Sequence, residues 1–231
     1  MTQRAIAYWV IPPEQDAEFV AAMENVLEVY ARPYESAHPV ICMDEQPVQL
    51  IKETREPLPA TQTQPARVDY QYERAGTASI FMFTEPLSCW RQASARPRRT
   101  KADWAEEVAF LLEGRYANCP RITLVCDNLN THTPGAFYEA FDAERARNLV
   151  RRIEFCHTPK HGSWLNIAEN ELSSMTRQCL GKRRIGDIET LRSEISAWST
   201  NVNNRQRGVD WQMKVDDARV KLKSIYPKIK I

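Results

Sequence analysis

Two short apolar runs, each ending on an aspartate, most strongly limit what this chain can fold into. Residues 41–43 (ICM) lead into Asp44, and residues 122–126 (ITLVC) lead into Asp127. A short run that is apolar at every position is typical of a strand buried on both faces of a parallel sheet. Ligands of open α/β sheets bind beyond the carboxyl ends of such strands, so neighbouring strands would bring both aspartates to one rim. Each aspartate taken alone is explained more simply as a turn former that hydrogen-bonds its own backbone.

The rest of the chain predicts a mixed α/β fold, because strand-like and helix-like segments alternate along most of its length. Thr100 as N-cap, Asp103 three residues later and Gly114 as terminator define the clearest helix. Alternation in residues 67–86 predicts an antiparallel hairpin with Gly76 in its turn. The other expected helices cover residues 12–33, 136–152, 164–180 and 187–198, and the other expected strands cover residues 38–44, 121–127 and 152–159.

The composition indicates one main globular domain with extensions. With 231 residues and 43% hydrophobic content, the chain is long enough to bury a sizeable core. No apolar run approaches the roughly 20 residues that a bilayer-spanning helix needs, and six scattered cysteines form no CxxC pair. We therefore expect a soluble protein in a reducing, intracellular setting, with neither a zinc site nor a disulfide framework.

Charge is unevenly distributed along the chain, although the formal net charge is only +1. Residues 1–39 are mainly acidic, whereas basic residues gather later in three clusters. Such clusters are usually solvated faces, and they would contact DNA phosphates only if they flank the same cleft. The clusters are Arg96, Arg98, Arg99 and Lys101; Lys182, Arg183 and Arg184; and the lysines of the tail KLKSIYPKIK.

The two aspartates raise the question of a metal site. Two carboxylates at one rim repel each other near neutral pH unless a divalent cation lies between them. Oxygen-only ligands with open positions suit Mg²⁺ or Mn²⁺ rather than Zn²⁺. A third acid is expected, and residues 164–180 offer Glu169 and Glu171. Both glutamates flank the apolar stripe of that predicted helix, on opposite sides, so periodicity does not choose between them.

Three segments carry a resemblance to a known family: CMDEQ (42–46), VCDNLNTH (125–132) and TPKHGSWLNIAE (158–169). In this order they resemble the catalytic domain of bacterial insertion-sequence DDE transposases of the insertion-sequence 630 family, relatives of the mariner transposases. The specific features are the DN pair at a strand end with a histidine a few residues on, and the pattern LNxxE opening a helix. The resemblance implies a catalytic and metal-binding triad of Asp44, Asp127 and Glu169, with two Mg²⁺ or Mn²⁺ ions per active site.

The resemblance also implies a fold and a domain organisation. The implied fold is α/β and RNase H-like, with a five-stranded mixed sheet flanked by helices on both faces. The expected parts are an N-terminal helical segment (1–36), an RNase H-like DDE catalytic domain (37–186), and a C-terminal helix with a basic tail (187–231). Such transposases usually carry N-terminal helix-turn-helix modules, whereas this chain predicts only an acidic helix there. It therefore resembles the catalytic half alone, as the second product of a frameshifted pair, a truncated copy or a remnant.

The activity implied by the resemblance is DNA strand cleavage at transposon ends followed by strand transfer, with insertion at TA sites. The implied partners are double-stranded DNA, a second copy of the chain in a homodimer, and a separately encoded helix-turn-helix subunit, in the nucleoid of a bacterial cytoplasm. Two alternatives stay open. Another RNase H-like nuclease, such as a junction resolvase or a ribonuclease, would share the acids but not the LNxxE pattern. A non-catalytic remnant that binds DNA or other partners predicts the loss of at least one triad position, and all three are present.

Two polar residues follow Asp127 closely and each has two interpretations. Asn128 either orients a carboxylate or contacts DNA, or it is simply a turn former. His132 either orients a carboxylate or contacts DNA, or it is an exposed loop residue.

Further candidates precede the helix that carries Glu169. Lys160 and His161 are placed to contact the DNA backbone, since a helix N-terminus favours phosphate, while Ser163 alternatively caps that helix. Trp164 is expected in the core rather than as a platform for stacking bases. The DNA-binding candidates are Asn128, His132, Lys160, His161, Arg98, Arg99, Lys182 and Arg183.

Overall fold

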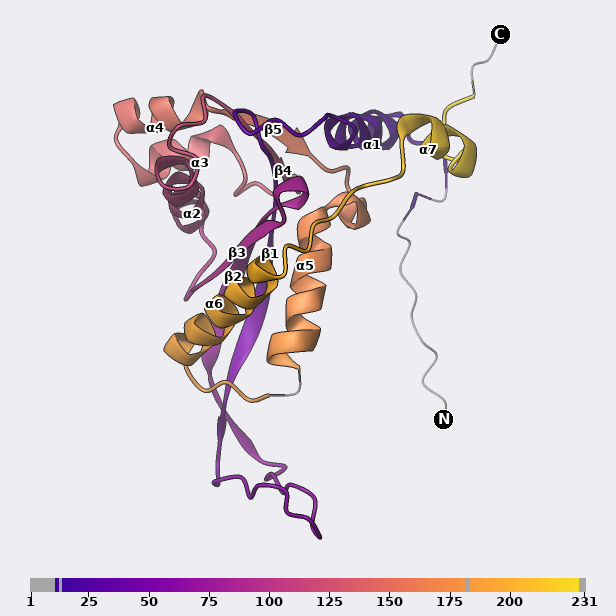
Figure 1. The fold of residues 1–231 in the computed structure, drawn as a ribbon. Coiled ribbons are helices and arrows are strands. Elements are labelled where there is room, and N and C mark those ends of the chain that lie inside the picture. The colour runs from indigo at the N-terminus through magenta and orange to yellow at the C-terminus, as the bar shows by residue number, and fades with distance from the viewer. Residues whose placement is uncertain (1–10, 13, 182, 229–231) are drawn as a thin grey trace.

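A five-stranded mixed sheet organises the part of the chain that the computed structural model describes, which is residues 11–12, 14–181 and 183–228. The strands lie in the order β3-β2-β1-β4-β5 (Figure 1). β1, β2 and β3 pair antiparallel, whereas β1, β4 and β5 pair parallel. The expected five-stranded mixed sheet is confirmed. Its strands are β1 (Val40–Glu53), β2 (Tyr72–Glu85), β3 (Trp90–Arg96), β4 (Ile122–Cys126) and β5 (Ile153–His157).

Helices cover both faces of the sheet, and each face has its own hydrophobic cluster (Figure 1). One cluster surrounds Trp104 and Phe137 and lies under α2 (Lys101–Glu113), α3 (Pro134–Ala140) and α4 (Ala143–Val150). The other contains Met23, Leu172 and Trp198. The helices over it are α1 (Ala17–Tyr30), α5 (Ile167–Met175), α6 (Ile188–Asn204) and α7 (Val215–Lys221), and shorter turns cover Pro86–Ser88 (η1), Ser163–Leu165 (η2) and Thr176–Leu180 (η3, a π-helical turn).

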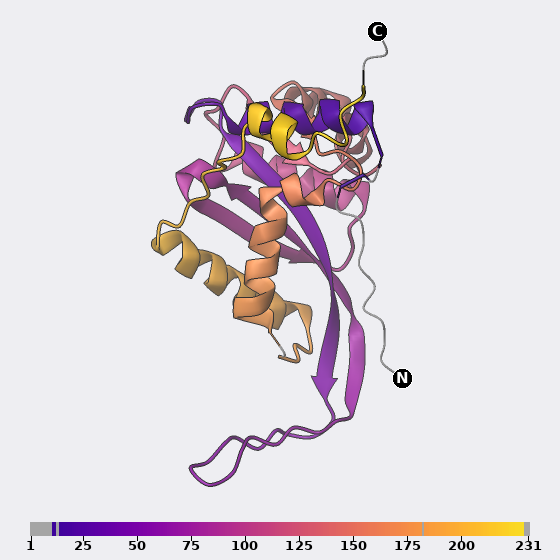
Figure 2. The same ribbon diagram turned by 90° about the vertical axis from the view of Figure 1, so that its right-hand side faces the viewer.

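The strand expected to end at Asp44 is longer than predicted, because β1 continues to Glu53. Only Val40–Cys42 pair in parallel with β4, whereas the pairing with β2 extends to Glu53. The β1–β2 ladder therefore runs beyond the other strands as a long two-stranded arm (Figure 2). The change from an apolar run to mixed residues at Asp44 marks the point where β1 leaves the centre of the sheet, and the strand itself does not end there.

The hairpin predicted for residues 67–86 is wrong. Residues 72–85 form the single strand β2, which pairs with β1 on one side and β3 on the other. Gly76 has a φ of +98° and lies where the register with β1 shifts between Gln49 and Ile51. Glycine adopts this backbone conformation at little cost, so the residue permits a β-bulge inside one strand rather than a turn between two.

The predicted helices are present, with changes at their ends. α2 has the expected capping box of Thr100 and Asp103 and ends at Gly114. The helix expected over residues 136–152 is divided, because Phe141 is extended and Asp142 caps α4 by accepting a hydrogen bond from the Arg145 amide at 2.9 Å.

Two elements were not expected from the sequence, β3 and α7. β3 alternates half-buried and buried positions at the edge of the sheet, which makes its apolar pattern weak. α7 is a short helix on α1, where Arg219 forms an ion pair with Glu24 at 2.9 Å. No helix in the described ranges is long and apolar enough to cross a membrane.

Candidate active site

β1 and β4 bring the two predicted aspartates to one edge of the sheet. Their parallel pairing ends with Cys42 opposite Val125, and Asp44 and Asp127 follow shortly after. Asp44 is half-buried, and the side chain of Asp127 is 37% exposed. Both carboxylates thus lie just beyond the parallel pairing of β1 with β4, at the carboxyl end of β4, and open α/β sheets bind their ligands at this position.

Asn166 fixes the helix that carries the third acid. Its side-chain oxygen accepts a hydrogen bond from the Ala168 amide at 3.1 Å and so caps α5, while its amide nitrogen donates to the Met43 carbonyl at 2.8 Å. This cap joins the first turn of α5 to the β1 backbone immediately before Asp44. Glu169 lies in that first turn and is exposed. The asparagine of the LNxxE pattern therefore positions Glu169 beside Asp44.

The pKa of Asp44 records how close the three acids lie. It is raised from 3.8 to about 7, first by burial, and further by the charges of Asp127, Glu45 and Glu169, against the lowering effect of a hydrogen bond from the Glu45 amide. Carboxylates that repel one another in this way are within electrostatic reach. We call Asp44, Asp127 and Glu169 the acid rim.

Glu171, the other glutamate considered from the sequence, has a different environment. Its side chain is 2% exposed and binds Arg207 through both oxygens at 2.7 and 2.8 Å, and it lies 3.1 Å from Nε of the buried Arg91. We call Arg91, Glu171 and Arg207 the arginine cluster. With its charge compensated there, Glu171 is not available to the acid rim, which favours Glu169 as the third acid.

His132 is completely buried rather than exposed in a loop. Its Nδ1 lies 2.6 Å from Oδ1 of Asp127, and its Nε2 lies 3.1 Å from Oε1 of Glu45. Burial lowers the pKa of His132, but the hydrogen bonds to Asp127, Cys126 and Glu45 raise it to about 12, so the ring is a cation at neutral pH. Because both nitrogens are bonded inside the protein, the residue orients a carboxylate and has no surface to offer DNA.

The donor chemistry of the acid rim fits a divalent metal ion. Its oxygen ligands suit Mg²⁺ or Mn²⁺, and a cation would favour the charged form of Asp44, which burial and the neighbouring carboxylates disfavour. In the side-chain positions of the described residues, no group of three or more histidine, cysteine, aspartate or glutamate residues is gathered closely enough to hold an ion. Glu169 is exposed, which leaves its side chain room to turn toward an ion.

The predicted DNA contacts fall into two groups. Asn128, Lys160 and His161 are exposed in the loops that follow β4 and β5, at the same edge of the sheet as the acid rim. His161 has a φ of +63°, which is uncommon for a residue other than glycine. Arg98 and Arg99 are exposed between β3 and α2 and form no ion pair with any described residue.

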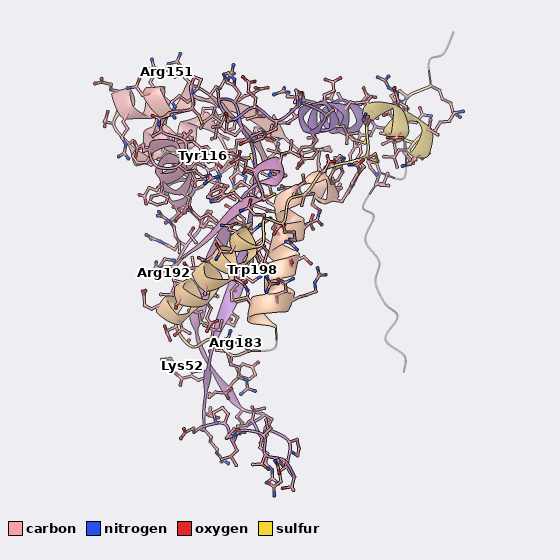
Figure 3. All side chains as sticks on the ribbon, in the orientation of Figure 1. Lys52, Tyr116, Arg151, Arg183, Arg192 and Trp198 are labelled. Carbon is pink, nitrogen blue, oxygen red and sulfur yellow. The ribbon has the colours of Figure 1, made fainter. Side chains whose placement is uncertain are left out.

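The other basic candidates are placed differently. Arg183 is bound through both guanidinium nitrogens to Glu194 at 2.6 and 2.7 Å, and it lies near Lys52 at the base of the β1–β2 arm (Figure 3). Lys182 lies outside the described residues. Arg96 and Lys101 are paired with neighbouring carboxylates. Arg183, Arg96 and Lys101 are therefore in ion pairs, whereas Arg98 and Arg99 form none with a described residue.

Two further expectations concern the start of α5. Ser163 begins the short turn η2 and makes no capping bond, since the cap of α5 is Asn166. Trp164 is partly buried and stacks on Trp211 at 6.5 Å between ring centroids, so its expected place in the core is confirmed.

Sequence reasoning overlooked Glu45, Asn166 and His157. Glu45 follows Asp44 directly and Asn166 stands inside the LNxxE pattern, so both had a signal in the segments already quoted. His157 ends β5, and its Nε2 lies 3.3 Å from the His132 carbonyl oxygen. Nothing in the sequence around His157 indicates this contact, because it joins the end of β5 to the loop after β4, and only the sheet brings the two together.

Comparison with solved structures places the fold among transposase catalytic domains. The catalytic domain of Mos1 mariner transposase matches with a TM-score of 0.52 and 12% identity over 85% of this chain and 90% of that one. A Mos1 mariner paired-end complex with Mn matches with a TM-score of 0.53 and 15% identity, covering 89% of this chain and 62% of that one. The chain thus spans about 62% of the length of that Mos1 protein. These likenesses confirm the RNase H-like fold.

Comparison with protein families gives the family itself. Comparison with curated proteins gave no significant match. The family model described as "DDE superfamily endonuclease" matches residues 39–192, which is more than half of the chain and includes the whole acid rim. This protein therefore belongs to the DDE superfamily of endonucleases and carries a transposase-like catalytic domain of RNase H-like fold.

Proposed function

We propose that this chain is the catalytic part of a transposase of the insertion-sequence 630 type, and that it cleaves DNA at transposon ends and joins the cut strand to a target. The observation that carries the proposal is that Asp44 and Asp127 lie just beyond the parallel pairing of β1 with β4, while the Asn166 cap joins the first turn of α5, which carries Glu169, to β1. The catalytic domain in this proposal covers residues 37–186.

Asp44, Asp127 and Glu169 would together hold two Mg²⁺ or Mn²⁺ ions. Such ions, when bound, activate the attacking water or 3′-hydroxyl and stabilise the leaving oxygen. The residues of this chain then mainly position the reacting groups. The Asn166 cap holds the first turn of α5 against β1, and Asp44 is half-buried on β1 at the inner side of the site.

DNA is the proposed substrate, and its backbone would contact the exposed residues around the rim. Asn128, Lys160 and His161 lie in the loops that follow β4 and β5, and Arg98 and Arg99 are exposed cations that form no ion pair with a described residue. One matching structure is described as a Mos1 transposase paired-end complex with the left transposon end. For this chain we propose a homodimer that holds two ends, and a separately encoded helix-turn-helix subunit that recognises them.

Metal binding tests the proposal most directly, because it does not require the terminal DNA sequence. Titration calorimetry with Mn²⁺ should show saturable binding that Asp127→Ala and Glu169→Ala each weaken by at least about tenfold. Glu144→Ala is the matched control, since Glu144 is an exposed glutamate in the first turn of α4, away from the rim. Nicking of a supercoiled plasmid in the same buffer should follow the same order of variants.

The competing function is a non-catalytic remnant that binds DNA or other partners. The presence of Asp44, Asp127 and Glu169 argues against it, because a remnant is under no constraint to keep all three. Absent Mn²⁺ binding, or binding that is indifferent to both substitutions, together with retained affinity for DNA, would favour the remnant and reject the enzyme.

A further inference from the structure

A chain of three titratable side chains, two of them buried, leads away from the acid rim on its inner side. Asp127, His132 and Glu45 follow one another at contacts of 2.6 and 3.1 Å. The side chains of His132 and Glu45 are 0% and 3% exposed, whereas that of Asp127 is 37% exposed. Only the Asp127 end of this chain therefore reaches solvent.

The fold holds the imidazole ring rigidly in place. The ring lies against Trp104 with centroids 5.2 Å apart, and Trp104 is itself completely buried in α2. The His132 amide donates to the Leu129 carbonyl at 3.0 Å, and its carbonyl oxygen lies 3.3 Å from Nε2 of His157. With ring and backbone both fixed, Nδ1 points toward Asp127, whose Oδ1 lies 2.6 Å away and whose backbone carbonyl oxygen lies 3.3 Å away.

Glu45 reaches the ring from β1. Successive side chains in a strand point to opposite faces, so Glu45 faces the α2 side of the sheet while Asp44 faces the α5 side. Neighbouring residues of β1 thus serve two different purposes at the same rim. Asp44 presents a carboxylate to the site, and Glu45 binds the far nitrogen of the histidine that contacts Asp127.

We propose that Glu45 and His132 are positioning residues for Asp127, an inference that rests on the proposed function. His132 binds Oδ1 of Asp127, and Glu45 binds the far nitrogen of the ring. Together they hold the Asp127 carboxylate in one rotamer, which leaves Oδ2 as the oxygen that Asp127 presents to a cation. Burying a carboxylate and an imidazole in contact is a poor way to stabilise a fold, since well-packed apolar side chains of similar volume commonly do as well or better. The arrangement is better explained by the precise placement it gives Asp127.

Two substitutions of His132 separate its two contacts. The asparagine amide nitrogen in His132→Asn falls near the position of Nδ1, and the glutamine amide nitrogen in His132→Gln falls near that of Nε2. We expect His132→Gln, which loses the Asp127 contact, to weaken Mn²⁺ binding by about 10–100-fold. His132→Asn should weaken Mn²⁺ binding less. Glu45→Gln should weaken Mn²⁺ binding several-fold in the native protein. In the His132→Asn variant the same change should cause no further loss, because Glu45 acts only through the imidazole ring.

A matched control identifies effects of stability alone. Glu85→Gln removes another buried carboxylate, one that is 4% exposed and accepts a hydrogen bond from the Tyr116 hydroxyl at 2.9 Å, at the end of β2. It should lower stability toward denaturant without changing Mn²⁺ affinity. If His132→Gln and Glu45→Gln behave in the same way as Glu85→Gln, the two residues are merely structural and the inference is overturned.

A metal-free measurement tests the inference even if the proposed function fails. NMR scalar couplings of the Asp127 β-protons should report one rotamer in the native protein and averaged rotamers in His132→Gln. Couplings that are the same in both proteins would overturn the positioning role, whatever Mn²⁺ does. A change in rotamers without any Mn²⁺ binding in the native protein would instead reject the proposed metal enzyme and keep the positioning role.

Discussion

Glu169 and Glu171 stand two positions apart on the same helix, yet they belong to regions of opposite character. Glu171 enters the arginine cluster, where its carboxylate is 2% exposed and is compensated by Arg91 and Arg207. Glu169 faces the acid rim, exposed and without an ion pair to any described residue. One helix therefore serves both the stability of the fold and the chemistry of the site.

The difference between the two regions concerns where positive charge is supplied. In the arginine cluster the protein provides its own cations, and Arg91 is further held by the Arg207 carbonyl at 2.6 Å and by Asn203. At the acid rim the buried cation is His132, which lies behind Asp127, and Asp44 forms no ion pair with any described residue. A buried acid that the protein leaves uncompensated is a candidate for an external cation.

The largest effect is expected from removing the acid of the arginine cluster. Glu171→Ala leaves Arg91 buried and uncompensated, which should cost about 3–5 kcal/mol of unfolding free energy. Glu169→Ala, on the same helix, should stay within about 0.5 kcal/mol, because that side chain is exposed. Urea unfolding of both variants measures the difference. Equal losses would show that the two glutamates do not differ in structural role.

The next largest effect is on Mn²⁺ affinity, where Glu169 should matter more than Glu171. Glu169→Gln should weaken Mn²⁺ binding by about 10–100-fold in calorimetry while leaving the urea midpoint unchanged. Glu171→Gln should shift the midpoint at constant Mn²⁺ affinity per folded molecule. A loss of Mn²⁺ affinity in Glu171→Gln as large as that in Glu169→Gln would mean that the arginine cluster acts on the site as well.

A smaller effect, on the pH dependence of stability, is expected at Asp44. Its pKa is about 7 in the folded state against 3.8 when unperturbed, so the folded state retains a proton that the unfolded state releases. Stability of the metal-free protein should therefore fall as pH rises from about 4 to 7. Asp44→Asn should remove this dependence and stabilise the metal-free protein at pH 8 by roughly 1–2 kcal/mol.

Thermal unfolding in chelator at pH 4, 6 and 8 measures this effect. The difference between Asp44→Asn and the native protein should grow with pH, and the other titrating groups cancel in that difference. An Asp44→Asn variant that is equally destabilised at all three pH values would show that ionisation of Asp44 does not destabilise the folded protein.

The smallest effect is expected on DNA binding, when arginines without an ion pair to a described residue are compared with an arginine that is in one. The double substitution Arg98→Ala with Arg99→Ala should weaken binding to a duplex of arbitrary sequence several-fold and reduce the salt slope by about 1–2. Arg183→Ala is the control, since Arg183 is already bound to Glu194. Fluorescence anisotropy at several salt concentrations compares them. A larger effect from Arg183→Ala would place the DNA near the base of the β1–β2 arm instead.

Much of the fold was predictable where local chemistry and tertiary structure agree. The helix at 101–113 carries its own caps, and the strand at 122–126 is apolar except for the buried Thr123 because helices cover both faces of the sheet. Predictions were wrong where a pattern has two causes. Gly76 permits a bulge rather than a turn, and Asp44 follows the end of a parallel pairing rather than the end of a strand.

The candidate site was predictable to a different degree. Asp44 and Asp127 follow from apolar runs that lead into carboxylates, and the LNxxE pattern pointed to Glu169 through resemblance. No periodicity could distinguish Glu169 from Glu171, because the arginines that bind Glu171 come from β3 and from the segment after α6. Ion pairs between residues so distant in sequence leave no local signal.

By itself, the amino-acid sequence determined the buried strands, the capped helices and the residue types that can hold a divalent cation, because burial patterns and caps depend on neighbouring residues. Only the tertiary structure decided which acids remain uncompensated, that His132 is buried between Asp127 and Glu45, and that Arg183 is paired while Arg98 and Arg99 are exposed without an ion pair to a described residue. The physical reason is that the charge state and accessibility of a side chain depend on groups brought within a few ångströms by folding, and these groups lie far away along the chain.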